Sequence, residues 1–424
     1  MQRGSAGFTV TAEMEAILRH PGYISCDAGG QRLRDLYQSQ SAAFDYNLYN
    51  PFARCCFLGL IRNVSRMVER GEAPDLTGTE TPYKFGYLTI AVTGCVMNMT
   101  PPPVCDYVSV VKCLLSSGAP PNSEDIVGYS ALHHAAMNNG HRDNPILLEL
   151  MRILLKNGAN ANHQNRYGEV PISGAFQHEE IGAIDILMEY GADLEMADAD
   201  GVKPNPFFIK CGAKVTAAVT KWLRKRTGEE APMGDTKMCS RCGRKGGSLK
   251  MCAKCHVARY CSTECQHAHW STHKLTCQPF DASNTVTVRP SYSAPGTMMS
   301  TADFSRQALG IPTEPTPASH QCAARAPKLR PEEAKAMIIK VQVPYSVLAD
   351  SPSTISRADM LVYTKKRDFV CNIKHSGNAA AYSRISQVVR SRGVGGAKAY
   401  FPAELKGKYE LIIKIGEVLA EQPF

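Results

Sequence analysis

Seven of the 16 cysteines fall in one run, residues 238–277, which reads MCSRCGRKGGSLKMCAKCHVARYCSTECQHAHWSTHKLTC. Together with His273 they give eight candidate metal ligands in the spacing C-x2-C-x9-C-x2-C-x5-C-x3-C-x7-H-x3-C. Zn²⁺ takes four thiolate or imidazole ligands in a tetrahedron, so eight ligands predict two closed sites. A closed site leaves no position for a reactive water, so this zinc is not expected to catalyse a reaction.

The spacing of the ligands also predicts local structure. Each C-x2-C pair is typical of a tight turn, whereas Cys261/Cys265 and His273/Cys277 are each four residues apart. Residues four apart lie on one face of a helix, so these pairs predict short helices. Because the run is too short for a hydrophobic core of its own, we expect bound metal to replace that core. His269, one turn before His273, is the alternative eighth ligand, and we interpret it as a surface histidine.

The run resembles a MYND-type zinc finger, including the segments A-R-Y-C, C-Q-H and W-x-x-H. That resemblance implies interleaved ligation of two zinc ions. The first set is Cys239, Cys242, Cys261 and Cys265, and the second is Cys252, Cys255, His273 and Cys277. RING modules differ, since their histidine comes in mid-motif and their last pair is a C-x2-C turn. The chain also lacks the N-H-x-C-x-P-N stretch of SET-domain methyltransferases.

The same resemblance implies a peptide-docking role, because MYND fingers take proline-rich P-x-L-x-P ligands. The positions that match the family's contact residues are Gln266 and Trp270. An indole face suits proline rings, and the short strand expected at 249–251 offers an edge to an extended peptide. The alternative is that Trp270 only packs between the zinc sites. The chain holds its own P-x-L-x-P sequence at Pro327–Pro331, which suggests self-contact with the finger as a hypothesis.

Four segments before the finger align on a glycine, with apolar residues seven, four and three positions earlier. They are VSRMVERG (64–71), VKCLLSSG (111–118), MRILLKNG (151–158) and IDILMEYG (184–191). This i, i+3, i+4 spacing predicts one apolar face of a helix that ends at a glycine. The glycines are 47, 40 and 33 residues apart, and the last interval equals an ankyrin period.

A companion first helix is clearest in GYSALHHAA (128–136), which resembles the ankyrin signature T-P-L-H-x-A-A. We therefore identify the chain as similar to the ankyrin repeat and MYND domain-containing family. His133 is then expected to bond backbone of the next repeat. A degenerate fifth unit is predicted at 201–226, with the helix 215–224 as a polar cap. The alternative is another helical-hairpin solenoid, such as a tetratricopeptide array.

The remaining regions are less regular. Short helices at 13–19 and 32–37 are expected to pack on the first repeat. A chain segment rich in Ser, Thr, Pro and Ala predicts a disordered linker. Strands at 337–343, 360–363, 369–373 and 409–415 and a helix at 378–392 predict a small α+β domain. The predicted regions are an N-terminal extension (1–41), four or five ankyrin repeats (42–228), the finger (237–279), the linker (280–330) and the α+β domain (331–424).

Hydropathy and charge limit the location and the class of partner that we expect for this chain. No stretch approaches the ~18 consecutive apolar residues of a membrane span, and the N-terminus has no secretory signal pattern. We expect an intracellular protein, cytoplasmic and/or nuclear, with reduced thiols. Residues 237–279 hold eight Lys/Arg and one Glu, yet lack an aromatic platform or a recognition helix, so nucleic acid is an unlikely partner.

The sequence therefore predicts a non-enzymatic adaptor with two zinc ions and two protein-docking surfaces. Two alternatives stay open. One is a transcription or chromatin factor whose basic finger contacts nucleic acid. The other is an enzyme with an unrecognised C-terminal catalytic domain, although residues 331–424 show no acid/base pair, nucleophile or phosphate loop.

Overall fold

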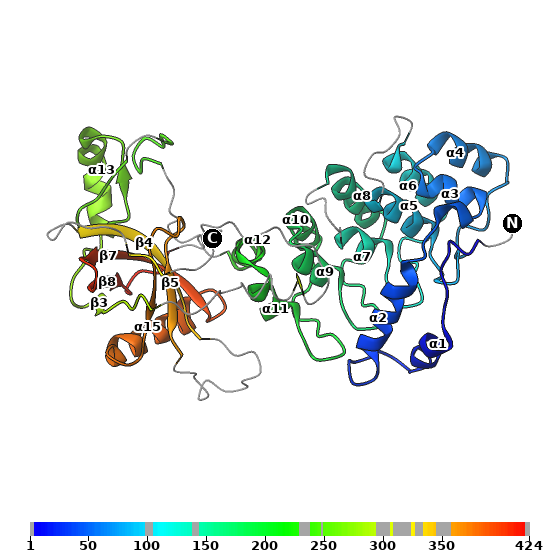
Figure 1. Ribbon diagram of the computed structural model, residues 1–424. Coiled ribbons are helices and arrows are strands. Elements are labelled where there is room, and N and C mark those ends of the chain that lie inside the picture. The colour runs from blue at the N-terminus through cyan, green and yellow to red at the C-terminus, as the bar shows by residue number, and fades with distance from the viewer. Residues whose placement is uncertain are drawn as a thin grey trace. The chain divides into compact units, whose positions relative to one another are not determined.

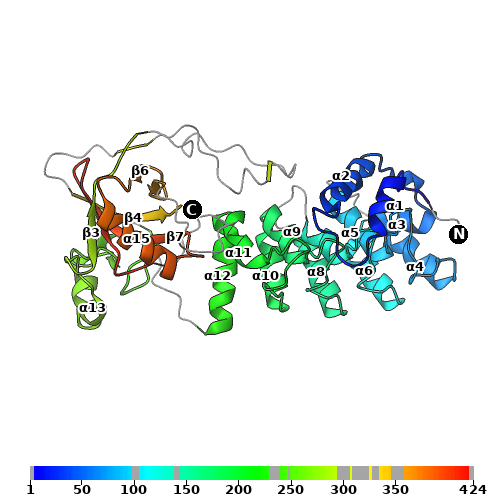
Figure 2. The ribbon, with the colours of Figure 1, turned by 90° about the horizontal axis from the view of Figure 1, so that it is seen from below.

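The computed structural model describes residues 4–97, 105–137, 144–228, 238–246, 249–293, 306–307, 324–326, 334–344 and 358–419. The chain divides into two compact units (Figures 1 and 2). One unit is Met1–Trp222 with Thr301–Thr313, and the other is Leu223–Ser300 with Glu314–Phe424. Among the described residues, no helix is both long enough and apolar enough to cross a membrane.

The first unit is a row of helical hairpins, which Figure 2 shows along its length. Their bounds are α3 Pro51–Phe57, α4 Ile61–Glu69, α5 Tyr87–Met97, α6 Tyr107–Ser116, α7 Ala131–Ala136, α8 Pro145–Lys156, α9 Pro171–His178 and α10 Ile181–Glu189. Each hairpin stacks on the next through both of its helices. The first helices pair as α3 on α5, α5 on α7 and α7 on α9, and the second helices as α4 on α6, α6 on α8 and α8 on α10. The predicted helix-ending glycines are confirmed, because Gly71, Gly118, Gly158 and Gly191 all have φ between +67° and +93°.

The loops between repeats carry a second register that the glycine alignment does not reveal. The side-chain oxygens of Asp125, Asn165 and Asp198 each accept the N–H groups two and four residues later. These positions repeat with the same intervals, 40 and 33 residues, as the last three helix-ending glycines. Consecutive loops are joined by backbone hydrogen bonds, from Arg166 N–H to the oxygen of Val127 and from Ala199 N–H to that of Tyr167.

The close stacking of consecutive loops leaves no room for a side chain at Gly168. Gly168 has φ +75°, and a Cβ added to it would lie 2.8 Å from the backbone nitrogen of Ala199. We expect Gly168→Ala to destabilise the unit by about 2–3 kcal/mol, from left-handed strain and overpacking together. The matched control is Gly191→Ala, since Gly191 has φ +82° but no atom within 4 Å of the added Cβ.

The measurement is urea unfolding followed through Trp222 in a Trp270→Phe background, which leaves Trp222 as the single tryptophan. Trp222 belongs to the ankyrin unit, where its indole N–H donates to Asp185 of α10. The control is expected to cost only about 1–2 kcal/mol, the backbone penalty alone. Equal costs for the two substitutions would contradict the role given to loop stacking.

The last helices of the unit lie where the fifth repeat was predicted. They are α11 Pro204–Phe207, the 3-10 helix η2 Phe208–Cys211 and α12 Ala213–Thr227. On α12 the buried residues are confined to 215–219, and the positions from 221 onward are exposed or half-buried. The buried positions 215, 216, 218 and 219 lie on one face of the helix, and the boundary between the two units falls after Trp222.

The N-terminal helices, α1 Ala12–Leu18 and α2 Gly30–Ser41, depart from expectation. They were predicted to pack on the first repeat, but they contact loops of several repeats. Tyr37 O–H donates to Asp125, while Arg34 donates to Glu169 at 3.0 Å and lies over the Tyr167 ring. The loops between repeats form one edge of the stack, which we call the loop edge, and the N-terminal segment binds its carboxylates and aromatic rings. Helix periodicity in the sequence does not show that these helices contact the loop edge.

The second unit contains a six-stranded antiparallel sheet in the order β3-β8-β7-β4-β5-β6. The strands are β3 Thr285–Val288, β4 Ala334–Gln342, β5 Met360–Tyr363, β6 Val370–Ile373, β7 Lys398–Lys406 and β8 Leu411–Lys414. The helix α15 Ala379–Arg392 lies against the sheet (Figure 1) and buries Tyr382, Ile385 and Val389 in its core. A C-terminal α+β arrangement is therefore present.

The prediction of a disordered linker over 280–330 is wrong for part of that range. Residues Thr285–Val288 form β3, an edge strand paired with β8, and Ser291 and Arg325 pair with Asn372 and Val370. The strand forms because Thr and Val alternate, so that both valines enter the core. It was missed because four residues are a short signal within a segment rich in Ser, Thr and Pro. The Pro327–Pro331 sequence proposed for self-contact lies outside the described residues.

Candidate metal centre

Two strands and one helix position the cysteines of the finger. Strands β1 Lys250–Met251 and β2 Arg259–Tyr260 pair as a short antiparallel hairpin, and the Cys252–Cys255 turn lies between them. Helix α13 Thr263–Thr276 follows, and the Ser262 side chain caps it by accepting the N–H of Cys265. The helix thus presents Cys265 in its first turn and His273 in its last.

The first cluster brings together Cys239, Cys242, Cys261 and Cys265. Their sulfurs all lie within 4.8 Å of one another, with 3.6 Å between Cys242 and Cys261 and 3.6 Å between Cys261 and Cys265. A tetrahedron with Zn–S bonds of about 2.3 Å has edges of about 3.8 Å. The spacing of these sulfurs therefore fits one zinc ion.

The second cluster brings together Cys252, Cys255, His273 and Cys277. The sulfurs of Cys252 and Cys277 are 4.0 Å apart, and His273 Nε2 is 3.5 Å from the Cys255 sulfur. With Zn–N bonds of about 2.0 Å, an S–N edge is about 3.5 Å. The imidazole thus points its Nε2 at the position that a tetrahedral ion would take.

The ligands are also the core of the finger. Cys239, Cys252 and Cys255 are at most 3% exposed, and within the described part of the finger they cluster with two other buried residues, Ala258 and Tyr260. A core this small buries too little apolar surface to offset the entropy of ordering some forty residues. Metal binding therefore has to supply much of the stability of this segment.

Electrostatics point to a divalent cation in both clusters. Burial raises the pKa of Cys277 to about 12, helped by the thiolates of Cys255 and Cys252. Hydrogen bonds with Cys242 and Cys265 raise the pKa of Cys261 to about 12. Several thiolates cannot share so small a volume without a compensating cation, and Zn²⁺ supplies that charge when it binds.

Three ligands favour the ligating state on their own, namely Cys239, Cys252 and His273. Burial opposes ionisation of Cys252, but hydrogen bonds from the backbone of Cys255 and Lys254 outweigh it and lower the pKa of this thiol. Burial opposes ionisation of Cys239, but backbone N–H groups, beginning with that of Cys242, outweigh it and lower the pKa of Cys239 to about 6. Burial, with the nearby His269, lowers the pKa of His273, which keeps its imidazole neutral. Thiolate and neutral imidazole are the forms that bind zinc.

The other candidate residues of the finger lie outside both clusters. His269 Nδ1 is hydrogen-bonded to the Tyr260 hydroxyl at 3.1 Å. Trp270 contacts the edge of the His273 ring at 5.9 Å between centroids and remains 36% exposed. Gln266 is half-buried one turn earlier on α13.

Sequence reasoning missed Phe280, which ties the finger to the sheet. Its N–H donates to the oxygen of Lys254 in the second cysteine turn, and its ring lies 4.6 Å from that of His256. The ammonium of Lys414, a buried residue of β8, lies 5.7 Å from the same ring. An aromatic residue three positions beyond the last ligand is the one available sequence signal.

Comparisons with known proteins agree with this geometry. The family model described as MYND finger matches residues 239–277, and the model described as Ankyrin repeats (3 copies) matches residues 104–198. Both matches follow the motifs from which the two modules were predicted. Ankyrin repeats and MYND fingers mediate protein interactions, and a MYND finger binds zinc.

Three curated relatives illustrate the local nature of the similarity. The E3 ubiquitin-protein ligase KEG of Arabidopsis thaliana is 34% identical over 27% of this chain and 7% of its own length. The Ankyrin repeat-containing protein P1E11.10 of Schizosaccharomyces pombe is 35% identical over 22% of this chain and 41% of its own.

The SET domain and MYND-type zinc finger protein 6 of Schizosaccharomyces pombe is 39% identical over 13% of this chain and 12% of its own length. The chain thus spans well under half the length of the relatives it matches, and the likeness is one of modules. What the matches and the two Cys/His clusters establish together is a chain that carries ankyrin repeats and a MYND zinc finger.

Proposed function

We propose that this protein is a non-enzymatic adaptor whose finger holds two zinc ions and docks proline-rich peptides. The observation that carries the proposal is Trp270, an exposed indole on α13 directly beside the metal ligand His273. In this assignment zinc is structural. It fixes α13 against the β1–β2 hairpin, and the finger's own side chains make the contacts with the partner.

The surroundings of Trp270 suit an extended apolar peptide. The Lys254 ammonium lies 5.3 Å from the indole centroid, on a long side chain that an incoming proline ring can displace. Gln266 lies one turn away and offers an amide to a peptide backbone. Among the described residues β1 pairs only with β2, so its other edge can accept a peptide strand.

The test is binding of a fluorescent peptide with a P-x-L-x-P core to the intact zinc-loaded protein, followed by anisotropy. We expect Trp270→Ala to weaken binding at least tenfold, because it removes a central aromatic anchor. The matched control is Leu275→Ala on the same helix, since Leu275 is 80% exposed and contacts neither cluster. That control is expected to change affinity less than twofold.

The outcomes separate the parts of the proposal. Equal affinity of the wild type and the Trp270→Ala variant would remove the role given to Trp270. No binding of the proline-rich peptide to the wild type would remove this ligand class. Tight retention on DNA with a steep salt dependence would favour the alternative of a nucleic-acid-binding factor. Native mass spectrometry of each variant verifies that the metal is still bound.

The ankyrin repeats are assigned a second partner, because such stacks present extended surfaces to proteins. Part of the loop edge is already covered by α2, so the remaining face is the one assigned to that partner. We assign to this second surface the proteins that bind the intact chain and that still bind the Trp270→Ala variant. We place the protein inside the cell, cytoplasmic and/or nuclear, because its zinc ligands require reduced thiols.

A further inference from the structure

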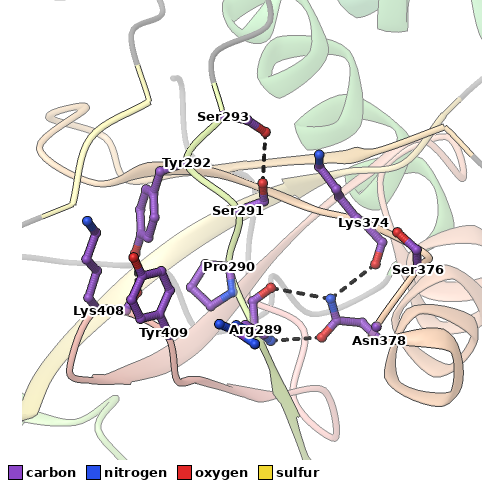
Figure 3. Close-up of a pocket in the computed structure, with 11 residues that line it drawn as sticks. Arg289, Pro290, Ser291, Tyr292, Ser293, Lys374, Ser376, Asn378, Lys408 and Tyr409 are labelled. Atoms are coloured by element: carbon purple, nitrogen blue, oxygen red, sulfur yellow. Dashed lines mark hydrogen bonds between the residues drawn. The ribbon is translucent and has the colours of Figure 1, made fainter.

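A cavity of about 440 Å³ opens on the sheet unit, and none of its lining residues belongs to the two zinc clusters (Figure 3). We call it the basic pocket and define it by Arg289, Tyr292, Lys374, Asn378, Lys408 and Tyr409. These residues come from the segment after β3, from the β6–α15 connection and from the β7–β8 turn. All three segments belong to one compact unit.

The pocket concentrates positive charge. Arg289, Lys374 and Lys408 all line it, and no Asp or Glu is among its lining residues. None of the three cations forms an ion pair with any residue that the structure describes. Gathering three like charges in one pocket is unfavourable unless an anion joins them. The wider region is also basic, since residues 358–419 contain eleven Lys/Arg and five Asp/Glu.

The framework of the pocket is fixed by hydrogen bonds. Figure 3 shows the Asn378 amide between two chain segments: its oxygen accepts the N–H of Arg289, and its nitrogen donates to the oxygens of Arg289 and Lys374. The Tyr292 hydroxyl donates to the oxygen of Lys408 at 2.8 Å. The cations are thus mounted on a backbone that is already organised before any ligand binds.

The amide of Asn378 is occupied by these contacts, so it does not cap α15, which begins at the next residue. The first turn of this 14-residue helix also holds no acidic side chain. Its positive end therefore adds to the potential that the three cations create.

We propose that the basic pocket binds a phosphate monoester carried on a phosphorylated side chain of a partner protein. A monoester dianion matches three cations gathered around one cavity better than a phosphodiester chain does, because a chain needs cations spaced along a track. The hydroxyls of Ser291 and Ser293 bond one another at 2.9 Å, which leaves one of the two as a donor to a phosphate oxygen, and the lining residue Ser376 offers another hydroxyl.

The walls of the pocket indicate that the phosphate arrives on a larger molecule. Arg289, Lys408 and Tyr409 are exposed, and Tyr409 keeps 53% of its surface in solvent. A small metabolite is usually buried over most of its surface, which these walls do not provide. The exposed Tyr409 ring, with Lys408 at 5.3 Å and Arg289 at 5.4 Å from its centroid, offers contact area to residues that flank the phosphate.

The test uses the intact zinc-loaded protein and a fluorescent hexapeptide with one phosphoserine in a Gly/Ala background. We expect the phosphorylated peptide to bind at least tenfold more tightly than its unphosphorylated twin. The double variant Arg289→Ala/Lys374→Ala is expected to lose at least tenfold of that affinity. Its matched control is Lys365→Ala/Lys366→Ala, which removes the same charge from the exposed β5–β6 turn and is expected to lose less than threefold.

Each contrary outcome overturns a stated part of the proposal. Equal losses in the two double variants would mean general surface charge, and no preference for the phosphorylated peptide would remove the site. If inorganic phosphate binds as tightly as the phosphopeptide, the pocket recognises phosphate alone, and the partner protein is not part of the ligand. Tighter binding of a twelve-residue oligothymidine would assign the pocket to nucleic acid. Because the pocket uses neither zinc nor Trp270, its failure is separable from failure of the peptide-docking function.

Discussion

Removal of zinc is expected to unfold residues 238–279 while the ankyrin repeats keep their helices. The reason is that, among the described residues, three of the five buried members of the finger's hydrophobic cluster are metal ligands, and the ligand His273 is buried as well. Structural zinc contributes about 10–16 kcal/mol in small fingers, which is as large as the whole stability of a typical domain. The hydrophobic cluster that the structure describes in the finger is too small to compensate for a loss of that size.

The measurement combines native mass spectrometry with limited trypsin digestion after treatment with a chelator. The loaded chain is expected to carry two zinc ions and to resist cleavage at Arg241, Lys250 and Arg259. The stripped chain is expected to be cut at these sites within minutes, because an unfolded segment is open to the protease. Far-UV circular dichroism should keep the signal of the ankyrin helices, whose core contains no metal ligand cluster among the described residues.

Two histidines on one helix provide the sharpest comparison. His273→Ala removes a ligand of the second cluster and is expected to leave one bound zinc ion. His269 lies one turn earlier, where its ring bonds Tyr260 and stacks on His273 but belongs to neither cluster, so two ions are expected to remain in His269→Ala. Two ions in both variants, or protease resistance after complete removal of metal, would contradict the assignment of zinc as the core of the finger.

The finger and the repeats could be predicted from sequence because their signals are local. The ligand spacing identifies the resemblance to a MYND finger, which implies which cysteines share an ion, and the structure groups the eight donors in the same interleaved sets. The helix-ending glycines depend only on a left-handed φ after the last turn. Both signals survive without knowledge of tertiary contacts.

The strands that were not predicted depend on pairing with strands from other parts of the sequence. Strand β7 is nine residues long and central in its sheet, yet Pro402 argues against a central strand. The structure accommodates this proline because the β7–β8 pairing begins only at Ala403. The backbone groups of Tyr400 and Lys406 point toward the β8 side, so at Pro402 the missing N–H faces that side, beyond the end of the ladder.

The ankyrin unit is expected to lose stability as pH falls below about 6.5, because His133 is held neutral. Its ring is 2% exposed; Nδ1 accepts the N–H of Ser130, and Nε2 donates to the oxygen of Glu169 in the next loop. Burial is the main cause that lowers its pKa to about 3, with His163 and His134 adding to it. In the unfolded chain the pKa is about 6.5.

The direction of this pH dependence follows from the number of protons that the folded and the unfolded chain bind. Between pH 6.5 and pH 3 the unfolded chain takes up a proton at this residue and the folded chain does not. The free energy of unfolding therefore falls by up to about 1.4 kcal/mol for each pH unit in that window. His133→Gln is expected to be less stable at pH 7.5, since it loses the two hydrogen bonds, but to show a slope shallower by that amount.

Urea unfolding followed through Trp222, in the Trp270→Phe background, measures this slope between pH 7.5 and pH 5. The exposed His20 serves as the control, because His20→Gln removes an imidazole that is solvated in both states and should keep the wild-type slope. Parallel pH profiles for the wild type and His133→Gln would mean that the folded repeats accept a proton on this ring. The bridge from α7 to the next loop would then have to survive as an imidazolium, with both ring nitrogens as donors and the N–H of Ser130 left without its acceptor.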